Sequence, residues 1–167
     1  MISIIPIGEM GILERMQPGT ITPLGGRELE ALVLRLARRP GEWITKVRLD
    51  AEGRWYERIH VSGGYEIWLI SWLPGQSTGF HDHGGSAGAF AVVWGELMES
   101  RVGAARAVVA GTARAFGPRY VHDVRNASAT SVAVSVHAYS PPLREMTRYA
   151  LTEAGLVPVA TEGSGDW

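Results

Sequence analysis

The stretch GQSTGFHDH, residues 75–83, holds two histidines separated by a single residue, His81 and His83. On a β-strand, side chains two positions apart point to the same face of the sheet. The two imidazoles would then lie side by side and could bind one metal ion. The pair alone is weak evidence, because any chain with five histidines has some chance of containing one. The flanking sequence therefore decides its meaning.

Glycines stand at regular distances on both sides of the histidine pair. Gly75 lies six residues before His81, and Gly95 lies twelve residues after His83. This spacing resembles the first motif of the cupin proteins. The cupin position that normally carries glutamate is occupied here by Gly88.

A third histidine, His122, stands four residues before Asn126. This His-x3-Asn pattern resembles the second cupin motif. Together the two motifs predict an all-β fold, a small jelly-roll-like cupin barrel, with a metal held by His81, His83 and His122. Three neutral imidazoles leave the full charge of a divalent ion, which favours an anionic ligand such as a thiolate. The ligand types alone leave both iron and zinc open, and the alternative without a metal is a set of buried structural histidines.

The remainder of the chain fits such a barrel with a helix outside it. Residues 27–39 (RELEALVLRLARR) carry apolar side chains at three- and four-residue spacing, which predicts an amphipathic helix that ends at Pro40. We expect one domain, 1–167, with a helical segment at 1–40, the barrel at 41–145 and a C-terminal segment with a polar tail at 146–167. Short β-prone runs between glycines and prolines predict strands at 54–61, 65–73, 87–94, 96–102, 105–110, 119–124 and 131–139.

The composition excludes several classes of function. The chain contains no cysteine, so disulfides, thiolate metal sites and a catalytic protein thiol are ruled out. A net charge of −1 argues against a dedicated nucleic-acid binder. No apolar run reaches the roughly 20 residues of a membrane span. The apolar residues 1–8 lack the basic region of a secretory signal, so the expected location is the cytoplasm.

A second polar pattern occurs in SVHAYSPP, residues 135–142. Ser135, His137 and Tyr139 alternate with apolar residues, so they share one strand face. This arrangement predicts a hydrogen-bond relay from the serine through the imidazole to the phenol. A nucleophilic hydrolase is the less favoured interpretation, because a serine on a strand lacks the sharp turn and the carboxylate of such sites.

Ser-x-His-x-Tyr-Ser-Pro-Pro after a His-x-His cupin motif resembles cysteine dioxygenase, a family of cupin-type thiol dioxygenases, over about residues 43–144. The resemblance implies Fe(II) as cofactor on the three histidines. It implies second-sphere roles for Ser135, His137 and Tyr139. It also implies that Arg58, within Tyr56-Glu-Arg58, pairs with the substrate carboxylate, with Tyr56 as a second candidate contact.

The resemblance further implies small-molecule partners, a thiol and O2, and conversion of L-cysteine to cysteine sulfinic acid. Arginine at position 58 favours L-cysteine over 3-mercaptopropionate, whose dioxygenases tend to carry glutamine there. Gly88 replaces the cysteine that animal members link to the tyrosine, so Tyr139 is expected to be a free phenol. The alternatives are a dioxygenase of 3-mercaptopropionate or another small thiol, a non-catalytic metal-binding cupin sensor, and a zinc hydrolase. The oligomeric state is left open, with a monomer plausible.

Overall fold

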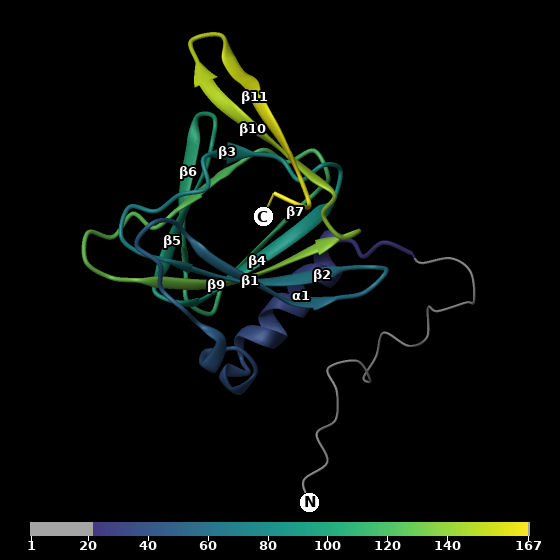
Figure 1. Ribbon diagram of the computed structural model, residues 1–167, viewed down its shortest axis with the longest axis vertical. Helices are drawn as coiled ribbons and strands as arrows, with labels where there is room; N and C mark the ends of the chain where they lie inside the picture. The colour runs from purple at the N-terminus through teal and green to yellow at the C-terminus, as the bar shows by residue number, and fades with distance from the viewer. Residues whose placement is uncertain (1–21, 167) are drawn as a thin grey trace, which may run out of the picture.

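The computed structural model of the chain describes residues 22–166, most of which lie in β-strands (Figure 1). They begin with one helix, α1 (Gly26–Ala37), and two short 3-10 turns, η2 (Pro40–Glu42) and η3 (Ile44–Lys46). The strands that follow are β1 (Trp55–Val61), β2 (Glu66–Trp72), β3 (Phe80–His81), β4 (Ala87–Trp94), β5 (Glu96–Arg101), β6 (Ala104–Val109), β7 (Ala113–Phe116), β8 (Asp123–Arg125), β9 (Ala133–Ser140), β10 (Glu145–Thr152) and β11 (Gly155–Gly163). The expectations for residues 1–21, including the absence of a secretory signal, lie outside the described residues.

The strands form one large antiparallel sheet and two smaller ones. The large sheet has the order β1-β2-β9-β4-β7, and the smaller ones have the orders β11-β10-β3 and β6-β5-β8. A β-bridge between His81 and His122 joins the two small sheets. In Figure 1 these small sheets stand over one face of the large sheet. The predicted jelly-roll-like cupin fold is confirmed, although the sheets do not close into a continuous barrel.

Helix α1 covers the other face of the large sheet, as expected from its amphipathic pattern (Figure 1). Its buried side chains, such as Leu29 and Val33, pack against outward-facing residues of the sheet, among them Leu69 and Val136. Burial of these aliphatic side chains is the main stabilising contribution of the helix. The helix begins at Gly26 and ends at Ala37, close to the predicted range.

Strand β9 shows how the sheet separates the helix from the interior of the fold. Every residue of β9 is buried, because both faces of the strand are covered. Val134, Val136 and Ala138 belong to the core beneath α1. The alternate residues, including His137 and Tyr139, therefore face the interior between the sheets. This alternation places the predicted polar relay inside the molecule.

Three strands were not predicted, one predicted strand is displaced, and the strand assumed for His81 and His83 is reduced to Phe80–His81. Residues 119–124 were expected to form a strand, but Gly117 and Tyr120 close a turn there and β8 starts at Asp123. The unpredicted strands are β7, β10 and β11. The C-terminal segment at 146–167, expected to end in a polar tail, is instead largely strand, because Glu145–Thr152 pairs with Gly155–Gly163 in a long hairpin.

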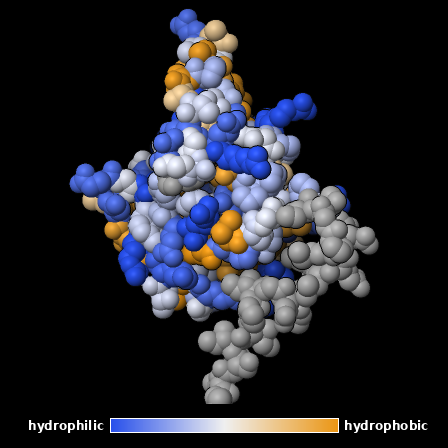
Figure 2. Space-filling view, turned by 45° about the vertical axis from the view of Figure 1, so that its right-hand side comes forward, coloured by the Kyte–Doolittle hydropathy of each residue, from blue (hydrophilic) through white to orange (hydrophobic). Residues whose placement is uncertain are grey.

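The outer half of the β10–β11 hairpin projects from the body of the molecule (Figure 1). Figure 2 shows hydrophobic side chains gathered on this projection, where Leu151, Val157 and Val159 are exposed. The inner half of the same hairpin pairs with β3 and so reaches the interior. Among the described residues, no helix combines the length and the apolar character needed to span a membrane.

Candidate metal centre and its pocket

The three predicted ligand histidines lie together in the structure. His81 ends β3, His83 follows it, and His122 directly precedes β8. Two backbone hydrogen bonds hold His81 against His122, with N···O distances of 3.0 and 3.1 Å. All three side chains are buried, and one ring nitrogen from each lies within 4.8 Å of the others. The strands thus bring the ligands of both sequence motifs to one point.

The hydrogen bonds of these rings leave their metal-facing nitrogens free. The Nδ1 atom of His81 lies 2.9 Å from the carbonyl oxygen of Gly79, so this nitrogen carries the proton and donates it. Its Nε2 atom is then an acceptor available to a metal. In His83 both ring nitrogens, Nδ1 and Nε2, are buried and have no hydrogen-bond partner among the described residues, and in a neutral ring one of them is an acceptor. A buried acceptor of this kind is costly unless it binds something.

The electrostatics also suit a metal. Burial, followed by the nearby His122, lowers the pKa of His81 well below its usual value. Burial and the neighbouring His81 and His122 do the same to the pKa of His83. Both imidazoles are therefore neutral at physiological pH, which is the form that binds metal. Three imidazoles with a fourth side open fit a catalytic Fe(II) or Zn(II) site.

The structure explains why position 88 carries no carboxylate. A Cβ atom on Gly88 would lie 2.4 Å from the ring of Phe116 and 3.0 Å from that of Tyr139. Phe116 fills this space and stacks on His83 at a centroid distance of 4.6 Å. A larger residue at position 88 would displace Phe116. The site is thereby restricted to histidine ligands on this side.

The predicted contacts between Ser135, His137 and Tyr139 are present, and they continue to a residue that was not predicted. Trp72 Nε1 donates to Ser135 Oγ at 2.8 Å, and Ser135 Oγ lies 2.8 Å from His137 Nε2. Tyr139 Oη lies 3.3 Å from His137 Nδ1. The contacts thus run in a chain through the interior. Their role in catalysis stays a prediction.

The direction of each hydrogen bond from Trp72 to Tyr139 follows from which atoms can donate a proton. An indole nitrogen can only donate, so Ser135 Oγ accepts from Trp72. Among the described residues His137 Nε2 is the remaining partner of the Ser135 hydroxyl, so the hydroxyl proton is directed to it. Burial, then His122 and Arg54, lower the pKa of His137 to about 3, so the ring is neutral. Its single proton is on Nδ1 and points to Tyr139 Oη, which leaves the phenol hydrogen free.

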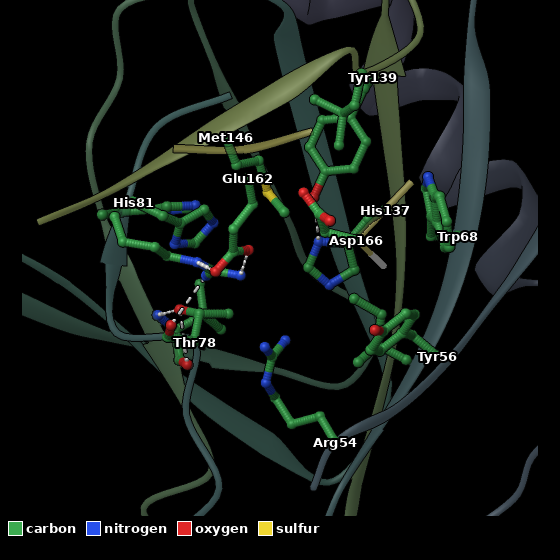
Figure 3. Close-up of a pocket in the computed structure, with 15 residues that line it drawn as sticks. Arg54, Tyr56, Trp68, Thr78, His81, His137, Tyr139, Met146, Glu162 and Asp166 are labelled. Carbon is green, nitrogen blue, oxygen red and sulfur yellow. Dashed lines mark hydrogen bonds and ion pairs between the residues drawn. The ribbon is translucent and has the colours of Figure 1, made fainter. Parts of the chain in front are cut away.

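A pocket of about 290 Å³ adjoins this group (Figure 3). It includes two ligand histidines, two relay residues and a charged region that was not predicted. Its lining includes His81, His122, His137, Tyr139, Arg54, Tyr56, Arg148, Glu162 and Asp166. The pocket therefore offers cationic and anionic groups near a candidate metal site.

The two arginines of the pocket differ in their partners. Arg148 is bound by both oxygens of Glu162, at 2.7 and 3.0 Å, and donates to the carbonyl of Thr78 at 3.2 Å. Arg54 has no ion pair with any described residue, and its guanidinium lies 5.3 Å from the centre of the Trp72 ring. Burial and the nearby Arg148 lower the pKa of Arg54. A cation in this environment is poised to bind an anion.

The structure places the two predicted substrate residues differently. Tyr56 lines the pocket and is 39% exposed. Arg58 is not one of the pocket residues: its guanidinium pairs with Glu66 at 3.3 Å and lies over the ring of Trp68. In the pairing of β1 with β2, Arg58 lies opposite Trp68, whereas Tyr56 lies opposite Ile70, two residues further along β2.

Sequence reasoning missed Arg54, although a signal for it existed. Arg54, Tyr56 and Arg58 are spaced two residues apart, so one strand face carries all three. The sequence could not show which of the two arginines lies beside the histidines. Arg148 and Glu162 were missed because their strands were not predicted.

Comparison with known proteins adds a family and a fold. A family model described as cysteine dioxygenase type I matches residues 26–152. No curated protein matches the chain. Among solved structures, TT1209 from Thermus thermophilus is 24% identical, with a TM-score of 0.54 over 59% of this chain and 94% of that one.

Two further structures are similarly related. A conserved protein with a double-stranded β-helix domain from Klebsiella pneumoniae is 18% identical, with a TM-score of 0.54 over 70% of this chain and 93% of its own. An RmlC-like cupin protein from Desulfovibrio desulfuricans is 22% identical, with a TM-score of 0.52 over 58% of this chain and 91% of its own. At these identities the structures establish a shared cupin fold and nothing further.

Proposed function

The chain belongs to the cysteine dioxygenase type I family, and on this basis we propose that it is an Fe(II)-dependent thiol dioxygenase that acts on L-cysteine. The reaction adds both atoms of O2 to the thiol sulfur, so that RSH and O2 give RSO2H, here cysteine sulfinic acid. Atoms and electrons balance without a further reductant. The observation that carries the proposal is a single pocket that joins the histidine cluster, the Tyr139 phenol and Arg54, which has no carboxylate partner among the described residues.

His81, His83 and His122 are the residues that would hold the iron. When bound, Fe(II) would supply a Lewis-acidic and redox-active centre at which a thiolate and O2 meet. Because imidazole ligands bring no charge of their own, a divalent ion held by them would keep its positive charge and favour the thiolate over the thiol. The chain itself contains no cysteine that could compete for the metal or be oxidised by it.

We assign to Arg54 the carboxylate-binding role that the family resemblance implied for Arg58. Arg54 lines the pocket without a described carboxylate partner, whereas Arg58 already pairs with Glu66 outside it. A guanidinium can bind a carboxylate through two parallel hydrogen bonds. Tyr56, on the same strand face, would border the bound substrate.

Tyr139 would donate a hydrogen bond to the reacting atoms. Burial and the nearby Glu66 raise the pKa of Tyr139, so the phenol keeps its proton at neutral pH. His137 donates to its oxygen from behind, which leaves the hydroxyl hydrogen to point into the pocket. Such a preorganised donor stabilises charge that develops during the reaction.

We favour L-cysteine over 3-mercaptopropionate as the substrate, because L-cysteine carries an ammonium group as well as a carboxylate. The pocket contains the carboxylates of Glu162 and Asp166 besides its arginines (Figure 3). Opposite charges in one pocket suit a zwitterionic thiol. 3-Mercaptopropionate, which has only the carboxylate, is the second candidate substrate.

The test is oxygen uptake by the anaerobically Fe(II)-loaded protein with L-cysteine, 3-mercaptopropionate and cysteamine, together with identification of the products. We expect the highest kcat/KM with L-cysteine and stoichiometric cysteine sulfinic acid. A higher kcat/KM with 3-mercaptopropionate would replace the substrate but keep the reaction. Tight thiol binding without oxygen uptake would indicate a sensor. Hydrolytic activity that depends on zinc, without oxygen uptake, would indicate a hydrolase. Either result overturns the proposal.

A further inference from the structure

Glu99 is a buried carboxylate that lies directly behind one ligand histidine. It is located on β5, in a different sheet from His81, and its side chain is 1% exposed. Its Oε1 atom lies 2.9 Å from Nδ1 of His122. The ring therefore donates its Nδ1 hydrogen to the carboxylate, and its Nε2 is left for the metal. No sequence motif pointed to this residue.

The other oxygen of Glu99 is held by arginines. Arg114 Nε donates to Oε2 at 3.0 Å, and Arg106 Nε lies 3.7 Å from the same atom. Together with His122, these arginines surround both oxygens of Glu99 with hydrogen-bond donors or positive charge, which favours the ionised carboxylate. The group is therefore a carboxylate anion, although it is almost completely removed from water.

The three ligand histidines consequently differ in what supports them. His81 donates to a neutral carbonyl, that of Gly79, whereas His122 donates to a full negative charge. Asp82, between His81 and His83, does not serve in the same way, because its oxygens bind Tyr149 and the backbone of the β10 strand. Among the described residues, Glu99 is the carboxylate in hydrogen-bond contact with a ligand ring.

We propose that Glu99 is a positioning residue that fixes the orientation of His122 and supplies, through that ring, the negative charge that the three neutral ligands lack. A histidine that donates to a carboxylate is a stronger electron donor to a metal than one that donates to a carbonyl. Position 88 cannot supply this charge, because Phe116 occupies the space beside Gly88. The carboxylate thus acts one residue removed from the metal.

Arg114 and Arg106 then set how much of this charge reaches the ring. A cation paired with the second oxygen withdraws electron density from the carboxylate. Removing Glu99 and removing Arg114 should therefore change the metal centre in opposite directions. A purely structural role for the cluster predicts the same direction for both, because either change would loosen the same packing.

The experiment compares wild type, Glu99→Gln and Arg114→Gln for two properties. The first is the affinity for Zn(II) and Fe(II), measured by competition with a chelator, and the second is the Fe(III)/Fe(II) midpoint potential. Glu99→Gln should weaken metal binding about 10- to 100-fold. It should also raise the midpoint potential, because the loss of a nearby negative charge destabilises Fe(II) less than Fe(III). Arg114→Gln should lower the midpoint potential. Arg106→Gln, which changes a more distant and half-exposed partner, should shift it in the same direction but less.

An unchanged potential in Glu99→Gln, or shifts of the same sign in Glu99→Gln and Arg114→Gln, would overturn the inference. Thermal unfolding of the metal-free variants checks that each is folded, and if Glu99→Gln is not, the sign of the shift in Arg114→Gln decides. The inference rests on the metal centre of the proposed function. Failure of the wild type to bind iron would remove that function, whereas normal binding with unaltered variants would remove only the role of Glu99.

Discussion

The wall of the pocket that carries the histidines and the wall that carries the arginines are built in different ways. The histidine wall consists of His81, His122 and His137, which line the pocket, with His83 beside them. These side chains are buried, and two backbone hydrogen bonds join His81 to His122. The charged wall contains Arg54, Arg148 and Glu162, which are partly exposed and come from separate segments of the chain. The first wall can position a metal rigidly, and the second can discriminate between substrates by charge. Substitutions in the first wall should therefore affect the turnover of every thiol, and substitutions in the second wall the turnover of only some thiols.

The largest effect is expected from loss of a ligand in the histidine wall. His83→Ala should reduce Fe(II) affinity by more than about 100-fold, since changes to residues that only support a ligand already cost up to that factor. Turnover of all thiols should be lost together. His60→Ala is the matched control, because His60 stacks on Tyr65 away from the cluster. Titration of both apoproteins with Fe(II) under anaerobic conditions measures the difference. Full metal binding by His83→Ala would remove it from the ligand set.

The next largest effect is expected from Arg54. Arg54→Ala should lower kcat/KM for L-cysteine about 10- to 100-fold, the range for loss of a hydrogen bond to a charged group. Cysteamine has no carboxylate, so its turnover should change little. Arg58→Ala is the control on the same strand face and should have a small effect on both thiols. Steady-state oxygen uptake with the two variants gives the answer. A larger loss in Arg58→Ala than in Arg54→Ala would return the role to Arg58.

The histidine wall was also the part that the sequence predicted well. A strand repeats its faces every two residues, so the Ser-x-His-x-Tyr pattern on β9 specifies its own geometry locally. The two rings of the His-x-His pair also lie close together, although β3 ends at His81 and His83 lies just beyond it. The helix at Gly26–Ala37 was predictable for the same reason, because its apolar spacing is local. The cupin spacing supplied the single long-range relation, between His83 and His122.

The charged wall depends on relations that no local pattern contains. Arg148 and Glu162 face each other because β10 pairs with β11, and neither strand was predicted from the sequence. The choice between Arg54 and Arg58 depends on where β1 sits along β2, which only the register decides. Glu99 was missed because it meets His122 across two strands, β5 and β8, and its own sequence context looks like an ordinary polar position.

Acid should reveal that His137, which belongs to the histidine wall, is buried and neutral. The pKa of His137 is about 3 in the folded protein, compared with about 6.5 for an unfolded histidine. Between these values the unfolded chain binds a proton that the folded chain excludes, so the free energy of unfolding falls as the pH decreases from about 6.5 towards 3. The contribution is about 1.4 kcal/mol per pH unit, or a tenfold change in the folding equilibrium.

The measurement is chemical denaturation of the metal-free protein at several pH values below 6.5. His137→Gln should lose stability less steeply than the wild type, by the slope of one histidine. Histidines 81 and 83 also have lowered pKa values and remain in both proteins, so the comparison isolates His137. Identical slopes would mean that His137 is protonated in the folded state or already neutral in both states.

The smallest effect concerns Trp72, which lies behind the relay and does not line the pocket. Trp72→Phe removes the Nε1–H that donates to Ser135 Oγ and keeps an aromatic ring in the core. The Ser135 hydroxyl would no longer be held as a donor to His137, so the phenol hydrogen of Tyr139 would be directed less strongly into the pocket. Loss of one neutral hydrogen bond corresponds to about a 2- to 10-fold change, which should appear in kcat with KM nearly unchanged.

Trp68→Phe is the matched control for this prediction, because it is the same substitution in the neighbouring inward-facing tryptophan. The Nε1 atom of Trp68 is buried and has no hydrogen-bond partner in the part of the chain that the structure describes, so its removal breaks no bond in the relay. Trp68 lines the pocket, so its replacement should change the shape of the charged wall and alter KM more than kcat. The two substitutions would then separate the walls, with kcat reporting on the histidine side and KM on the arginine side. An equal loss of kcat in both variants would mean that the indole rings act by packing alone and that the direction of the relay hydrogen bonds does not matter.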